Sequence, residues 1–334
     1  MKSSHRNVFW VFGLVALCLQ GYGLWNDEAW TTVARSVATV LLPLLTLAWA
    51  LDYLCSARSY QLVVNHSSSD LRLPFRKAYK LTLTGSAFGA VTPFGLGGGP
   101  YRVMELSRYI GVPRAMSAVV VDCLLQLFSL FLLWLVALGG FAFGYADRMS
   151  RPLSLLFISL AIGLTFALGF LFHGFRKGLL DRLYRGVLLH LPFCHRFFEK
   201  CYHRCSDVMI EVDQCIARLY AAPRVFWKVM GYQFLSRLGE ILEILLLLWL
   251  LGVDLSFAEA LLILAFSSLL GYLFPLLPAS LAVSCGGLAC AATFLEITNW
   301  SIATLAVFYM RLREWCWIAL GIGLLKVGNA RLMR

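Results

Sequence analysis

Long apolar runs dominate this chain of 334 residues and constrain its fold more than any other feature. A helix of about 20 apolar residues is long enough to cross the hydrocarbon core of a bilayer. Hydrophobic residues make up 60% of the chain and charged residues only 14%, well below the roughly 25% charged of an ordinary soluble domain. The sequence therefore predicts an all-α polytopic membrane protein, with residues 1–334 forming a single integral membrane domain. The expected transmembrane helices are residues 8–25, 33–55, 116–145, 153–175, 225–251 and 302–327.

The first apolar run has a rival interpretation as a cleaved secretion signal, because Lys2 and Arg6 precede it. Its apolar part is long and ends in the residues GYGLWNDE at 21–28, without a small-x-small cleavage site. We therefore expect an uncleaved first helix.

Two further apolar stretches, residues 79–110 and 257–296, are interrupted by glycine and proline. The first contains TPFGLGGGPYRVMEL at 92–106, and the second contains FPLLP at 274–278 followed by CGG at 285–287. Proline and clustered glycine break a helix, and unwound backbone survives in a bilayer only where protein or a wet cavity satisfies its polar groups. Both stretches are therefore predicted to be re-entrant helical hairpins.

Basic residues predict the orientation of the chain, because short cytoplasmic loops are enriched in Lys and Arg. Lys and Arg cluster before residue 7, between residues 58 and 80, and over residues 176–228, which hold ten of them. Six spans and two hairpins put both termini in the cytoplasm, in agreement with the basic tail. The net charge of +11 therefore indicates orientation and attraction to anionic lipids. No nucleic-acid partner is expected, because these residues flank apolar runs and form no recognition motif.

The two broken stretches also suggest an internal repeat. Alignment of Pro93 with Pro275 sets residues 81–93 against residues 263–275, and each stretch lies between two predicted spans. Because the two stretches enter from opposite sides, the repeat would be inverted. Transporters use inverted repeats with broken helices to build a binding site near the membrane midplane.

The first break has the chemistry of an anion site. A half-helix starting at Pro100 would direct unpaired N–H groups at a ligand, and Gly97 to Gly99 would let that ligand approach the backbone. Arg102 would add a planar guanidinium that suits phosphate or carboxylate. The alternative is a local ion pair between Arg102 and Glu105, three residues apart.

Other charged residues lie inside predicted spans, where an unpaired charge costs several kcal/mol. Such residues face the protein interior or a wet cavity, where they bind substrate or hold helices together. A proton relay through Glu240 or Asp122 has no specific support. Other charges that cluster in predicted spans are Arg237, Glu243, Arg311, Arg313 and Glu314.

The ten cysteines do not form a recognised metal motif. Cys194, Cys201 and Cys205 would share one helical face, with His195 and His203 nearby, but their spacing is no standard zinc spacing. We expect this segment, residues 176–228, to be cytoplasmic and to contain an amphipathic helix lying on the membrane. The chain also lacks G-x-S-x-G, P-loop and H-E-x-x-H motifs, so no enzyme activity, cofactor or metal is expected.

Three motifs resemble those of the lysylphosphatidylglycerol synthase transmembrane-region family, also described as flippase-like. One branch of that family reads roughly TP-x4-GGEPYR-x-MEL-x4-G, FPMQLG-x-REGG and R-x-RE-x-x-WI, and the matching residues here are 92–111, 274–287 and 311–318. The resemblance spans nearly the whole chain and implies a protein of the cell inner membrane with two re-entrant helices. Relatives are associated with movement of phospholipids or lipid-linked sugars across the bilayer.

The chain departs from the family pattern at several polar positions. Gly99 stands where the pattern has Glu, and Ser284 and Cys285 stand where it has Arg-Glu. The other departures are Ala282 for Gly, Gly89 for Asn and Gln126 for His. Either the substrate differs, or the chain has lost transport and serves as a partner. The residues that we expect to bind substrate are Gly97, Gly98, Gly99, Tyr101, Arg102, Glu105, Arg237, Glu240, Arg311, Arg313 and Glu314.

The resemblance implies a flippase-like protein that moves or binds an anionic phospholipid or a polyprenyl-phosphate lipid. The alternative is a non-transporting membrane subunit or scaffold in an envelope lipid or glycan pathway. In the family, aminoacyl transfer belongs to a separate soluble domain that follows the membrane part. Because this chain stops at Arg334, we expect no aminoacyl-transferase activity. The sequence predicts no particular protein partner.

Overall fold

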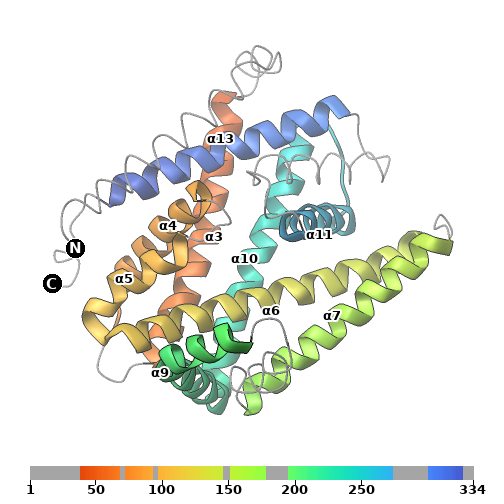
Figure 1. The fold of residues 1–334 in the computed structure, drawn as a ribbon. Helices are drawn as coiled ribbons and strands as arrows, with labels where there is room; N and C mark the ends of the chain where they lie inside the picture. Colours follow the sequence, from red (N-terminus) through yellow and green to blue (C-terminus); the bar gives the residue numbers. More distant parts are fainter. Residues whose placement is uncertain are drawn as a thin grey trace. The chain divides into compact units, whose positions relative to one another are not determined.

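The computed structural model of the chain describes residues 38–67, 72–92, 97–145, 151–177, 195–273 and 300–325 (Figure 1). Every regular element in these residues is a helix, so the predicted all-α fold is confirmed there. The helices are α3 (Ala38–Ser67), α4 (Phe75–Val91), α5 (Gly98–Ile110), α6 (Val112–Tyr145), α7 (Arg151–Lys177), α9 (His195–Ala221), α10 (Pro223–Leu250), α11 (Phe257–Leu273) and α13 (Trp300–Leu324).

Five of the predicted spans correspond to long helices, namely α3, α6, α7, α10 and α13. The span predicted at residues 8–25 lies outside the described residues. Within those residues, Val112–Ala142 of α6 is the one segment both long and apolar enough to cross a membrane, and Ile158–His173 and Phe257–Leu269 are shorter apolar helices. The number of membrane crossings therefore stays a prediction.

Local sequence explains several helix boundaries. Gly111 and Gly252 have φ angles of 79° and 80° and follow the last residues of α5 and α10, because a left-handed residue that ends a helix is best supplied by glycine. At the start of α11, the Ser256 N–H donates to Glu259 Oε2 at 2.8 Å, and the Glu259 N–H donates to Ser256 Oγ at 3.3 Å. This reciprocal capping box fixes the first turn of α11.

The predicted break in the first hairpin is confirmed, because α4 ends at Val91 and α5 begins at Gly98. In the second stretch, α11 ends at Leu273, two residues before Pro275. The rest of that stretch lies outside the described residues. Whether either hairpin re-enters the membrane stays a prediction.

Helix bounds repeat along the chain with a constant offset. The first residues of α4 and α11 are 182 positions apart, as are their last residues, so the two helices have the same length of 17 residues. The same shift carries α3 onto α10 and α6 onto α13, with differences of one to six residues at the helix ends. These bounds support the alignment of Pro93 with Pro275. The inverted orientation of the two halves stays a prediction.

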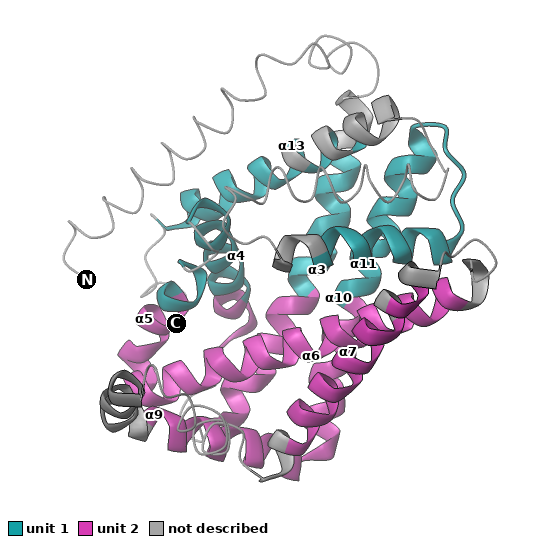
Figure 2. Cartoon of the chain, turned by 45° about the vertical axis from the view of Figure 1, so that its right-hand side comes forward, with its two compact units in different colours: residues 1–54, 79–101, 236–334 teal, residues 55–78, 102–235 magenta. Residues whose placement is uncertain are grey.

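The chain forms two compact units that alternate along the sequence (Figure 2). Unit 1 comprises residues 1–54, 79–101 and 236–334, and unit 2 comprises residues 55–78 and 102–235. The boundaries fall inside α3, α4, α5 and α10. Each unit is described separately below.

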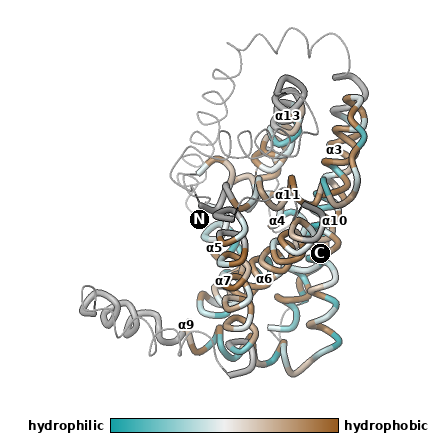
Figure 3. The backbone as a smooth tube through the Cα atoms, turned by 90° about the vertical axis from the view of Figure 1, so that its right-hand side faces the viewer, coloured by the Kyte–Doolittle hydropathy of each residue, from teal (hydrophilic) through white to brown (hydrophobic). Residues whose placement is uncertain are grey.

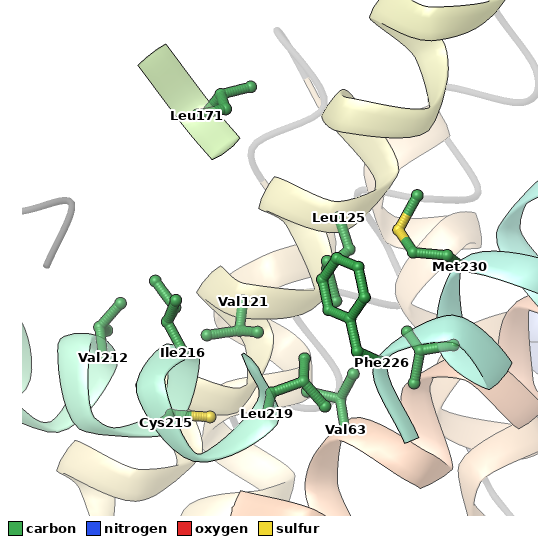
Figure 4. Close-up of a cluster of buried hydrophobic side chains, with 11 residues drawn as sticks. Val63, Val121, Leu125, Leu171, Val212, Cys215, Ile216, Leu219, Phe226 and Met230 are labelled. Carbon is green, nitrogen blue, oxygen red and sulfur yellow. The ribbon is translucent and has the colours of Figure 1, made fainter. Parts of the chain in front are cut away.

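The core of unit 2 joins side chains from α3, α6, α7, α9 and α10 (Figure 4). Val212, Cys215, Ile216 and Leu219 of α9 are all buried in this cluster. They recur at spacings of three and four residues, so they form one apolar face of the helix. The remaining members are Val63, Val121, Leu125, Leu171, Phe226, Val229 and Met230.

The C-terminal part of α9 packs against the protein through the buried face at residues 212–219. The face that we expected to lie on the membrane is a different one, that of Cys194, Cys201 and Cys205. The expectation for that face stays a prediction. The side chains at the start of α9, including Cys201 and Cys205, lie outside the described residues, as does Cys194.

Large apolar side chains remain exposed on several helices, among them α3, α6, α7 and α10. Figure 3 shows hydrophobic residues (brown) along α3, α6 and α7. Phe166 of α7 is 77% exposed, and Leu47 of α3 and Trp227 of α10 are each 65% exposed. Helix faces of this kind suit contact with lipid chains, whereas soluble monomers rarely expose large apolar patches.

Candidate functional site

The break between α4 and α5 is held together by close backbone contacts in unit 1. The Gly97 N–H donates to Thr92 Oγ1 at 2.8 Å. A Cβ added to Gly98 would lie 2.5 Å from the Gly85 carbonyl oxygen, and one added to Gly97 would lie 2.6 Å from the Thr92 methyl group. These contacts give the two glycines a role in packing. A ligand role for Gly97, Gly98 and Gly99 stays a prediction.

Tyr101 also packs within this hairpin. Its ring lies 4.8 Å from the ring of Phe88 on α4, and only 7% of the residue is exposed. Tyr101 therefore packs α5 onto α4, and the adjacent residues Tyr101 and Arg102 combine a packing side chain with a charged one.

Arg102 forms an ion pair that the sequence analysis did not predict. Its Nη1 lies 3.2 Å from Asp122 Oδ2, and the side chains of Arg102 and Asp122 are 11% and 0% exposed. Gln126 Nε2 donates to the same carboxylate oxygen at 3.0 Å, and the guanidinium lies 5.4 Å from the centre of the Tyr60 ring. Because Asp122 and Gln126 are one helical turn apart on α6, both reach the same point.

The predicted local pair of Arg102 with Glu105 is therefore replaced by a pair between α5 and α6. Glu105 Oε2 instead lies 3.6 Å from Nη1 of Arg108, whose side chain is 39% exposed. Arg102 and Arg108 are each three residues from Glu105, so sequence spacing alone could not show which of them pairs with it. The buried Asp122 decides the choice for Arg102.

A second polar cluster lies in unit 1, on α3, α10 and α13. Arg237 Nη1 donates to Glu240 Oε1 at 2.7 Å within α10. Arg313 of α13 forms an ion pair with Glu243, and both side chains are at most 5% exposed. The Arg313 guanidinium also stacks on Trp49 of α3, 3.7 Å from the ring centre. Arg313 and Glu243 thus join α13 to α10, whereas Arg237 and Glu240 pair within α10.

Asp52 belongs to the same cluster and was missed by the sequence analysis. It is 7% exposed on α3 and accepts a hydrogen bond from the Ser236 hydroxyl of α10. A usable signal existed, since Asp52 is the one acidic residue within the span predicted at residues 33–55. Isolated charges in apolar runs are candidates for function.

Two further predicted site residues, Glu314 and Arg311, lie on α13. Glu314 is half-buried on α13, and the side chain of Arg311 lies outside the described residues. Arg102 and Glu105 belong to unit 2, whereas Arg237, Glu240 and Arg313 belong to unit 1. The paired charges among the predicted site residues therefore form two clusters, one in each unit.

The part of the chain that the structure describes contains no group of three or more His, Cys, Asp or Glu residues suited to a metal ion. Cys215 of α9 lies in the core of unit 2, with its sulfur 2.7 Å from Ser67 Oγ. Burial raises the pKa of the Cys215 thiol, and a thiol in this state is a weak metal ligand and a weak nucleophile.

The family model described as the lysylphosphatidylglycerol synthase TM region matches residues 8–321. The chain belongs to this family. No curated protein and no solved structure matches this chain. Membership confirms the resemblance carried by the three motifs and identifies a membrane protein related to lipid pathways. The inner-membrane location and the cytoplasmic termini stay predictions.

Proposed function

We propose that the protein moves an anionic phospholipid or a polyprenyl-phosphate lipid between the leaflets of the membrane, with Arg102 binding the headgroup. The single observation that carries this proposal is the state of the Arg102 guanidinium. Its Nη1 contacts Asp122, but its Nε has no hydrogen-bond partner among the described residues. A guanidinium has five N–H donors, and the buried Nε–H of Arg102 is one that a phosphate would satisfy.

The surroundings of Arg102 support this role. Asp122 is fully buried and, with the Tyr60 ring, fixes the guanidinium in place before any ligand binds. Preorganised donors bind an anion at a lower cost in side-chain entropy than mobile ones do. The exposed apolar faces of α3, α7 and α10 would meanwhile contact the acyl chains.

A lipid-movement assay tests the proposal. The purified protein is placed in liposomes that carry a fluorescent phosphatidylglycerol, and a membrane-impermeant quencher reports the leaflet distribution. Arg102→Lys keeps the charge beside Asp122 but loses the planar fork. A charged hydrogen bond contributes about 1.5 to 3 kcal/mol, so the rate is expected to fall about 10-fold to 100-fold.

Arg108→Ala is the matched control, because Arg108 lies on the same helix but is 39% exposed. It should leave the rate within about twofold, as expected for an exposed charge. An equal loss in both variants would contradict a specific headgroup role for Arg102.

The second candidate is a non-transporting scaffold, and the ion pairs of unit 1 favour it. Arg313 of α13 is bound to Glu243 of α10, as expected for a charge that joins two helices, and Arg237 is bound to Glu240 within α10. If the wild-type protein changes the leaflet distribution of neither phosphatidylglycerol nor a polyprenyl phosphate, the scaffold becomes the better account.

A further inference from the structure

Asp52 differs from Arg237 and Arg313 in the kind of partner that it has. Arg237 is bound to Glu240 and Arg313 to Glu243. Asp52 is bound to a neutral hydroxyl, that of Ser236. Each guanidinium is thus paired with a glutamate, whereas Asp52 forms no ion pair with any of the residues that the structure describes.

The charged groups around Asp52 act on its carboxylate in both directions. From the neighbouring helices, Glu240 of α10 repels it, whereas Arg237 of α10 and Arg313 of α13 attract it, and Tyr53 follows it on α3. Ser236, Glu240 and Glu243 recur at spacings of four and three residues, so they lie along one face of α10. A Cβ added to Gly239, on the same face, would lie 3.9 Å from the Asp52 Cβ.

Burying a charge without an ionic partner is costly, and a carboxylate can remove that cost by taking up a proton. Ser236 suits both states of Asp52. Its hydroxyl donates to the carboxylate and can equally accept a hydrogen bond from the carboxylic acid. The site therefore keeps its hydrogen bond whether or not the proton is present.

We propose that Asp52 is a proton-binding site that couples lipid movement to a pH gradient. The proton comes from water, forms an O–H bond with the Asp52 carboxylate, and returns to water when that bond breaks. The coupling rests on the proposed function above. An anionic headgroup that crosses together with one proton carries no net charge, so the membrane potential does not oppose the step.

The proton site itself is tested without any transport. Infrared difference spectra of the purified protein in phosphatidylglycerol liposomes, recorded between acidic and alkaline buffer, show the C=O band of a carboxylic acid. We expect this band in the wild type, its loss in Asp52→Asn, and its retention in Asp254→Asn, where the aspartate is exposed. Loss of the band in Glu240→Gln but not in Asp52→Asn would overturn the assignment.

A second variant keeps the test decisive if Asp52→Asn does not fold. Ser236→Ala leaves all charges in place but removes the hydrogen bond to Asp52. The carboxylic-acid band should then remain and move in wavenumber. An unmoved band would place the proton elsewhere and overturn the proposal.

The coupling is tested in the liposome assay with a gradient of one pH unit. One proton moved per lipid shifts the leaflet ratio of fluorescent phosphatidylglycerol by up to about tenfold. Asp52→Asn should abolish this shift. If the wild type moves the lipid but its leaflet ratio does not change with the pH gradient, the coupling is overturned and the proposed function is still supported. A band that depends on Asp52 without any lipid movement would support the proton site and contradict the proposed function.

Discussion

At the scale of single residues, the charge balance of Arg102 depends on Asp122. Arg102 is 11% exposed and Asp122 is fully buried, so neither charge is well solvated. We predict that Asp122→Ala lowers the free energy of unfolding by about 3 to 5 kcal/mol, because it leaves an uncompensated guanidinium in the interior. Thermal or denaturant unfolding in detergent measures this loss.

The double variant Arg102→Met with Asp122→Leu should recover most of the lost stability, since it removes both charges at once. Glu211→Gln is the control, because its partners Arg114 and Arg218 are 45% and 49% exposed and lie 3.9 and 4.0 Å away. That change should cost about 0 to 1 kcal/mol. A double variant as unstable as Asp122→Ala would contradict the pairing.

At the scale of helices, the sequence predicts where elements lie better than which elements they contact. Apolar runs located α3, α6, α7, α10 and α13, and the glycines and prolines located the break before α5. Glu105 and Asp122 were both available to Arg102, but only the packing of α5 on α6 selects Asp122. The same limit applies to Val212 and Ile216 of α9, because their spacing predicts an apolar face but does not identify the helices against which it packs.

The contact between α4 and α5 gives a prediction at this scale. Gly98→Ala would place a methyl group 2.5 Å from the Gly85 carbonyl oxygen, so the hairpin must open. Overpacking of this kind costs about 1 to 3 kcal/mol, measured as lower thermal stability in detergent.

Gly163→Ala is the matched control, because no atom lies within 4 Å of a Cβ at that position on α7. It should be neutral or should stabilise the protein by up to about 1 kcal/mol through helix propensity. If Gly98→Ala keeps full stability and only slows lipid movement, Gly98 contacts a ligand and its packing role is wrong.

At the scale of the whole molecule, the repeat is clearer in helix bounds than in sequence. Few residues agree between residues 81–93 and 263–275, yet α4 and α11 begin and end 182 positions apart. Helix length and break position depend on broad apolar patterns, which tolerate many substitutions, whereas individual polar residues do not. This is why Ser284 can stand where the offset places the counterpart of Arg102 while the architecture is kept.

The offset also pairs Arg72 with Asp254, which precede α4 and α11 and are both exposed. If residues 79–110 form a re-entrant hairpin, the chain crosses the membrane through α6, α7 and α10 between these positions, which is an odd number of crossings. We therefore predict that Arg72 and Asp254 lie on opposite sides of the membrane. If residues 79–110 were instead a full span, the number would be even and the sides the same.

Single cysteines distinguish the two topologies. Arg72→Cys and Asp254→Cys are made separately in a background from which the ten native cysteines have been removed. In intact cells an impermeant maleimide should label Asp254→Cys, which is predicted to lie on the side opposite the basic loops. The same reagent should label Arg72→Cys only after the membrane is permeabilised. A permeant maleimide that labels both variants shows that each cysteine is reactive. Labelling of both from one side would exclude the inverted repeat, because an inversion requires equivalent positions to face opposite compartments.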